Sequence, residues 1–228
     1  SLYSAYTGFR RVYLAIMRGR PEERFDRLPE RVGRALWLVL TQQTVFKRRP
    51  LVSLLHAFVF YGFVYYLLVN LVVFLEGFFG LHARGGMWYA YNIVDDLLTF
   101  LILVGILGLM LRRYLLAPRD FTWNPNVPLH EKARAGIARD SAIVGAFIAF
   151  HVGSRLLSKA FQLAGEGPDP FQPVASALAG ALSGLPPALL TFGEHFFWWG
   201  ALGSILLFLP YFPRSKRIHL FMAPINLA

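Results

Sequence analysis

The chain has 228 residues, of which 56% are hydrophobic and only 16% are charged, and its mean hydropathy is +0.47. Because soluble domains carry about 25% charged residues, this composition excludes an ordinary soluble domain and indicates an integral membrane protein. The chain has no cysteine, which excludes disulfides, zinc–thiolate sites and cysteine-ligated iron–sulfur clusters within it. Histidine is then the main remaining soft metal ligand.

Four segments are long and apolar enough to cross a bilayer, which takes about 20 mostly apolar residues. They are residues 51–75, 93–111, 141–161 and 185–212. The opening stretch 1–20 lacks an initiator methionine and looks like the end of an earlier span. We therefore expect an all-α integral membrane protein forming a single domain over 1–228. Its fold would be a bundle of four complete transmembrane helices plus a truncated first one.

The segments between these spans carry turn and surface signals. Segment 21–49 is charged but has apolar residues at helical spacing (Val32, Leu36 and Leu40), which predicts a surface helix. Pro50 suits the first turn of the next helix. Residues 165–173 are rich in glycine and proline, which predicts a loop between the last two spans. The small-residue stretch 174–184 follows them and suits the outer membrane interface. Residues 213–228 form a tail after the last span.

The basic residues are distributed asymmetrically. Of 23 Lys and Arg, eleven lie in 10–49, six in 112–139 and three in 214–217. Short cytoplasmic segments are enriched in these residues, so the charge predicts that these three segments, including the C-terminus, face the cytoplasm. The net charge of +10 is then explained by the basic segments on the cytoplasmic side, which are attracted to anionic lipids. A nucleic-acid partner is therefore not expected. The bacterial inner membrane is the expected location.

Four of the six histidines lie in the spans or just after the last one. Counting residues from the span ends places His56 and His219 near the inner side, and His151 and His195 near the middle of two antiparallel spans. Each pair is matched in depth. Two neutral imidazoles on neighbouring helices can bind the iron of a b-type haem from opposite faces. A lone intramembrane histidine is more often a packing residue, so packing and ligation both stay open for each.

Other polar residues within the spans are candidates for proton or cofactor chemistry, because such residues are costly in a bilayer. Asp95 and Asp96 could pass protons to a quinone, or could be an acid pair at a helix N-terminus. Glu194 could orient His195 or relay protons. Arg155 lies four residues after His151 and could contact a haem propionate, or could extend towards the interface. The aromatic runs 58–61 and 196–199 could line a haem or quinone pocket or could face lipid.

Several stretches of the sequence resemble a known family. LPYFPRSKRIHLFMAPINL (209–227) resembles the end of the membrane part of heterodisulfide-reductase-related Fe–S oxidoreductases, whose broader relative is the gamma subunit of respiratory nitrate reductase. RRPLVSLLHAFVFYGF (48–63) and LILVGILGLMLRRYLLAPRDF (101–121) look like the second and third spans of the same group. GRPEERFD (19–26) precedes them in a similar place.

This resemblance implies a five-helix, dihaem cytochrome b module that exchanges electrons between quinone and a cytoplasmic Fe–S partner. In members that act on electron-transfer flavoprotein, it implies menaquinone reduction. By the same matching, His56 and His219 correspond to the inner-haem ligands. Tyr66 stands where nitrate-reductase-type relatives carry a second histidine. We therefore assign His151 as the substitute ligand, on depth alone, and pair it with His195.

Two functions follow as expectations. The first is a membrane cytochrome b module with one or two b haems, in which an Fe–S protein or domain is the partner, a menaquinone or other quinone is the substrate, and Glu194, Asp95 and Asp96 handle protons. The second is a haem-free membrane anchor for a soluble oxidoreductase. In the family, the cysteine-rich Fe–S region normally follows the membrane part in the same chain, whereas this sequence ends at Ala228. The sequence therefore leaves open whether that region belongs to this chain or to another polypeptide.

Overall fold

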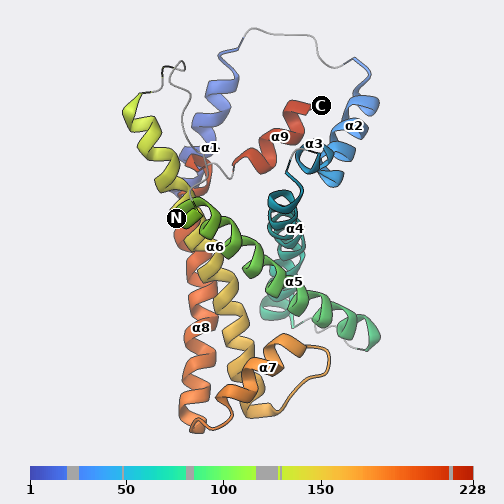
Figure 1. Cartoon of the computed structure of the whole chain (residues 1–228), viewed down its shortest axis with the longest axis vertical. Helices are drawn as coiled ribbons and strands as arrows, with labels where there is room; N and C mark the ends of the chain where they lie inside the picture. The colour runs from blue at the N-terminus through green and yellow to red at the C-terminus, as the bar shows by residue number, and fades with distance from the viewer. Residues whose placement is uncertain are drawn as a thin grey trace. The chain divides into compact units, whose positions relative to one another are not determined.

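The computed structural model describes residues 1–19, 26–47, 49–80, 85–116, 128, 130–215 and 218–227. These residues form helices and no strand (Figure 1), in agreement with the expected all-α class. In chain order the elements are α1 (Leu2–Ile16), α2 (Leu28–Thr41), α3 (Gln43–Phe46), α4 (Pro50–Phe79), α5 (Gly86–Leu111), the π-helix η1 (Arg112–Leu116), α6 (Glu131–Glu166), α7 (Pro173–Leu182), α8 (Pro187–Phe208), the 3-10 helix η3 (Phe212–Arg214) and α9 (His219–Leu227).

The helices form two compact units, each with its own packing. Unit 1 comprises Ser1–Ser53, Asn124–Val144 and Ser204–Ala228. Within it α1 lies against η3, where Gly8 meets the ring of Pro213 and the rings of Phe9 and Phe212 are 6.2 Å apart. A Cβ on Gly8 would lie 2.8 Å from the Pro213 side chain, so glycine is needed for this close approach. Helices α2 and α9 also pack against each other in this unit.

Unit 2 comprises Leu54–Trp123 and Gly145–Gly203. In it α4 and α5 pack with their backbones close together. A Cβ on Gly105 of α5 would lie 2.6 Å from the carbonyl oxygen of Leu55 on α4, and one on Gly62 would overlap the Ile102 side chain. Small residues at such crossings let helices approach closely, which is the usual way that helices associate in a bilayer.

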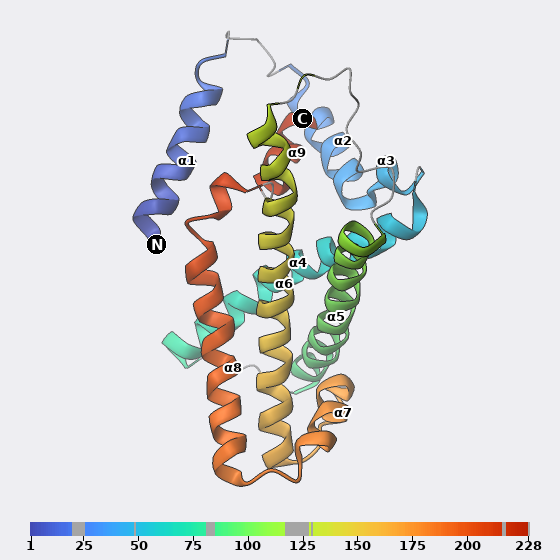
Figure 2. The ribbon, with the colours of Figure 1, turned by 60° about the vertical axis from the view of Figure 1, so that its left-hand side comes forward.

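The part of α6 in unit 2 packs between α7 and α8. Leu156 and Leu163 of α6 are buried against Ala175 and Ala179 of α7. On another face of α6, a Cβ on Gly193 of α8 would overlap the ring of Phe161. The α6 and α8 segments of this unit run side by side in both ribbon views (Figures 1 and 2).

Within the part of the chain that the structure describes, three helices are long and apolar enough to span a membrane: Pro50–Val72, Gly86–Leu116 and Gly136–Glu166. They coincide with the first three expected spans. The fourth expected span, 185–212, contains the 22-residue helix α8. Glu194, His195 and two tryptophans lower the mean hydropathy of α8, so it is not among these three helices. Four complete spans are therefore not confirmed. The truncated first span also stays a prediction, since α1 has 15 residues, and the single membrane domain stays a prediction as well.

Candidate functional site

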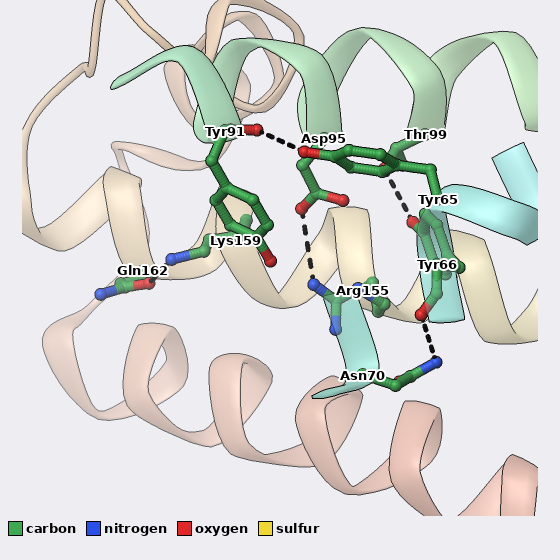
Figure 3. Close-up of polar contacts among 9 residues, drawn as sticks. All are labelled: Tyr65, Tyr66, Asn70, Tyr91, Asp95, Thr99, Arg155, Lys159 and Gln162. Atoms are coloured by element: carbon green, nitrogen blue, oxygen red, sulfur yellow. Dashed lines mark hydrogen bonds and ion pairs between the residues drawn. The ribbon is translucent and has the colours of Figure 1, made fainter. Parts of the chain in front are cut away.

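A group of polar side chains lies inside unit 2, where α4, α5 and α6 meet (Figure 3). We call Tyr66, Asp95, Thr99, His151 and Arg155 the polar cluster. Asp95 and Thr99 are four residues apart on α5, and His151 and Arg155 are four apart on α6, so each pair projects from one helix face. Tyr66 and His151 are only 5% and 7% exposed. The sequence predicted three of the five as site residues, and the structure brings those three together.

An ion pair links α5 to α6 in this cluster. Arg155 Nη2 lies 3.4 Å from Asp95 Oδ2, and the side chains are 20% and 18% exposed. A charge pair inside a protein avoids part of the cost that either charge alone would incur, and ionisable residues within membrane spans are functional candidates by default. Asp95 holds the Arg155 guanidinium in this structure, while the contact of Arg155 with a haem propionate and its extension towards the interface both stay predictions.

Tyr66 is the centre of the cluster. Its hydroxyl is 2.7 Å from the Thr99 hydroxyl, and the Arg155 guanidinium carbon lies 5.3 Å from the centre of its ring. The ring also meets His151 edge-on, with ring centres 5.9 Å apart. Tyr66 therefore contacts Thr99 on α5 and both Arg155 and His151 on α6. Sequence reasoning noted Tyr66 only as a replaced histidine and did not include Thr99.

Two buried polar atoms of the ion pair have no hydrogen-bond partner among the described residues. They are Asp95 Oδ1 and Arg155 Nε. Leaving a buried polar group unsatisfied costs about 1–3 kcal/mol, so native proteins usually satisfy such atoms with water or a ligand. One atom accepts a hydrogen bond and the other donates one. A water molecule, a hydroxyl group or a carbonyl–hydroxyl pair matches that combination.

His151 is oriented by the helix beside it. Its Nδ1 is 3.1 Å from the carbonyl oxygen of Ala201 on α8, and its ring stacks on Phe147 with centres 5.7 Å apart. A carbonyl only accepts hydrogen bonds, so Nδ1 carries the proton and Nε2 of the neutral ring carries the lone pair. This is the arrangement usual for a metal-ligating histidine, whose other nitrogen donates to a carbonyl. His151 thus has the donor chemistry that an axial haem ligand requires.

The structure does not bring His195 beside His151. Ser158 of α6 donates a hydrogen bond to the carbonyl oxygen of Glu194, whereas His151 is level with Ala201. The seven residues from His151 to Ser158 correspond to about 10 Å along the helix axis. His195 is also exposed on α8. Their joint ligation of one haem therefore stays a prediction from sequence, as does a proton role for Glu194.

Asp96 has a different task from Asp95. Its carboxylate accepts hydrogen bonds from the backbone N–H groups of Val174 (2.6 Å) and Ala175 (3.0 Å) in the first turn of α7. A carboxylate is favourable there because the N-terminal N–H groups of a helix lack partners within it. Asp96 thus holds α7 to α5. Neither acid sits at the N-terminus of its own helix, because α5 begins at Gly86 rather than near residue 93.

The predicted inner pair, His56 and His219, lies in α4 and at the start of α9. His56 belongs to unit 2 and His219 to unit 1, and each is described within its own unit. Their pairing stays a prediction. Among the described residues, no group of three or more His, Asp or Glu side chains could hold a metal ion.

The chain is distantly similar to a Bacillus subtilis (strain 168) protein described as "Probable iron-sulfur-binding oxidoreductase FadF". The two are 27% identical over 235 residues, which cover 99% of this chain and 31% of that protein. The chain therefore spans about a third of the length of this relative. No family model matches the chain, and no solved structure matches it. The similarity supports a relation to iron–sulfur oxidoreductases and suggests an electron-transfer role, while the relation to the nitrate reductase gamma subunit stays a prediction.

Proposed function

We propose that this chain is a membrane module that carries electrons between an iron–sulfur protein or domain and a quinone, with haem b as the carrier. The observation that carries the proposal is the polar cluster inside a bundle whose whole length aligns with part of an iron–sulfur-binding oxidoreductase. A plain anchor needs no buried ion pair, because its helices can pack through apolar and small residues alone. Intramembrane ionisable residues are functional candidates by default.

His56 and His219 would hold a haem near the cytoplasmic side, and His151 would be one ligand of a second haem; its pairing with His195 stays a prediction from sequence, because the structure does not bring His195 beside it. His151 supports this assignment through its Nδ1 hydrogen bond to Ala201, which fixes the ring in the orientation that metal-ligating histidines usually have. Bound haem supplies one-electron transfer, which links single-electron iron–sulfur chemistry to two-electron quinone chemistry. An iron–sulfur protein is the expected electron donor or acceptor, and electron-transfer flavoprotein is a candidate that would feed it.

The polar cluster is the proposed quinone site. Arg155 Nε can donate a hydrogen bond to a quinone oxygen, and Asp95 Oδ1 can accept one from a quinol hydroxyl. Reduction of a quinone takes two electrons and two protons, so a carboxyl group beside the ring oxygen can take up protons and pass them on while the Arg155 charge keeps the site polar. Glu194 is a second candidate for proton transfer on α8. Asp96 is the weaker candidate, because both its oxygens are bonded to α7.

The haem content of the purified full chain tests the proposal. We expect a pyridine haemochrome spectrum of the b type, with one or two haems per chain. His56→Ala and His219→Ala should each remove one haem, and His151→Ala should remove another if the chain holds two. His130→Ala, outside the proposed ligand set, is the matched control. A folded, colourless protein would instead favour the haem-free anchor and overturn the haem assignment.

A further inference from the structure

A line of polar side chains runs along α6 from the polar cluster to the end of the helix, and Figure 3 shows its first three members, Arg155, Lys159 and Gln162. Its members are Arg155, Lys159, Gln162 and Glu166, spaced by four, three and four residues, which keeps them on one face. We call this line the α6 stripe. Arg155 pairs with Asp95, and Glu166 is exposed at the last residue of the helix.

Hydrogen bonds connect the outer three members. Lys159 Nζ donates to Gln162 Oε1 at 3.0 Å, and Gln162 Nε2 donates to both carboxylate oxygens of Glu166 at 3.2 Å. Lys159 and Gln162 are half-buried, so exposure rises along the stripe towards Glu166. An apolar membrane helix has no need of four successive polar residues on one face.

We infer that the α6 stripe lines a hydrated path through which Asp95 exchanges protons with the aqueous side where α6 ends. The two buried atoms without a hydrogen-bond partner, Asp95 Oδ1 and Arg155 Nε, lie at the buried end of this path, where water could satisfy them. Asp95 is faced there by the positive charges of Arg155 and Lys159 and by the negative charge of Asp96. The charge distribution predicts that this side is opposite to the basic segment 112–139.

The purpose of the path rests on the proposed quinone chemistry. Two electrons reach the quinone from the iron–sulfur partner, and two protons must arrive to complete the quinol. Water in the path gives a proton from the aqueous side to the Asp95 carboxylate, which then bears an O–H bond. That O–H bond breaks as Asp95 passes the proton to a reduced quinone oxygen and the quinol O–H bond forms, and a second such cycle supplies the second proton. Lys159 and Gln162 bind that water and do not themselves change bonds.

Single-cysteine variants test the path without any quinone chemistry, because the chain has no cysteine of its own. Lys159→Cys and Gln162→Cys in membranes should react with a small charged methanethiosulfonate. Each has a matched neighbour at the same depth. Ser158 faces α8 through its bond to Glu194, and Leu163 is buried against α7. We expect Lys159→Cys and Gln162→Cys to react at least tenfold faster than Ser158→Cys and Leu163→Cys. Equal rates within both pairs would overturn the path.

A second measurement uses electron transfer from the reduced full chain to menadione, a small naphthoquinone. Gln162→Leu should slow this reaction about tenfold, and Ser158→Ala should leave it unchanged. An unchanged rate in Gln162→Leu contradicts the path even if the cysteine variants fold poorly. Failure of the wild-type chain to react with menadione would instead refute the proposed function. Fast labelling of positions 159 and 162 in that case would still support the hydrated path.

Discussion

Substituting Asp96 should loosen the first turn of α7 specifically. The carboxylate accepts two backbone hydrogen bonds, at 2.6 and 3.0 Å, and Ala175 is buried. Hydrogen bonds to a charged group contribute about 1.5–3 kcal/mol each. Asp96→Ala removes both and should therefore destabilise the docked helix by about 3–6 kcal/mol. Asp96→Asn keeps one acceptor oxygen and should cost about half as much, since its NH₂ group then faces the second N–H.

Hydrogen exchange of the α7 amides measures this effect directly. Local opening that is easier by about 3 kcal/mol accelerates exchange roughly a hundredfold, because each 1.36 kcal/mol corresponds to a factor of ten. Mass spectrometry of peptides that contain residues 174 and 175, from protein in detergent micelles, should show this acceleration in Asp96→Ala. Asp95→Ala is the control, because the Asp95 carboxylate pairs with Arg155 instead. Wild-type exchange at these amides in Asp96→Ala would refute the reasoning.

Further substitutions test the contacts within each unit. Gly105→Ala would place a Cβ 2.6 Å from the Leu55 carbonyl oxygen and should destabilise unit 2 by about 1–3 kcal/mol. Gly203→Ala is the control, because no atom lies within 4 Å of its Cβ, and it should leave the unfolding temperature in detergent unchanged or slightly raised. Equal shifts of the unfolding temperature in the two variants would contradict the close approach of α4 and α5. The Tyr211 hydroxyl donates to Asp140 Oδ1 at 2.6 Å in unit 1. Tyr211→Phe and Asp140→Asn should each lower the free energy of unfolding by about 1–2 kcal/mol, and the double variant should lower it no more than either single one. Simple addition of the two losses would show that this hydrogen bond contributes nothing to stability.

Hydrophobicity and punctuation predicted most of the helices. The charge-free run 51–75 and Pro50 locate α4, which begins at Pro50. The start of α5 could not be predicted in the same way, because residues 86–92 are rich in Trp and Tyr and interrupt the aliphatic pattern that identifies a span. Helix α6 likewise begins at Glu131, ten residues before the predicted span. Five of its first ten residues are charged, which interrupts the apolar pattern, yet they continue the same helix.

These shifted ends explain which parts of the site could be predicted. Asp95, His151 and Arg155 are conspicuous because each is polar within an apolar run. Which residues of neighbouring helices lie side by side could not be predicted. The depth of each residue in the membrane was counted from the ends of the spans, and hydropathy misplaces those ends. His151 therefore lies beside Ala201 and not beside His195. Asp96 precedes Val174 by 78 residues and Ala175 by 79, so no local sequence pattern could predict its hydrogen bonds to α7.

The junction between Asp96 and α7 also bears on how the chain is assembled. Pro173 has no N–H group, the N–H groups of Val174 and Ala175 go to Asp96, and that of Ser176 goes to the Gln172 carbonyl. The first turn of α7 is thus complete only when α5 is beside it. Asp96 precedes Val174 by 78 residues, so during synthesis the acceptor is made well before the donors that need it. An acceptor for the first-turn amides of α7 therefore already exists when those amides are made, and α7 can dock onto a helix that precedes it in the chain.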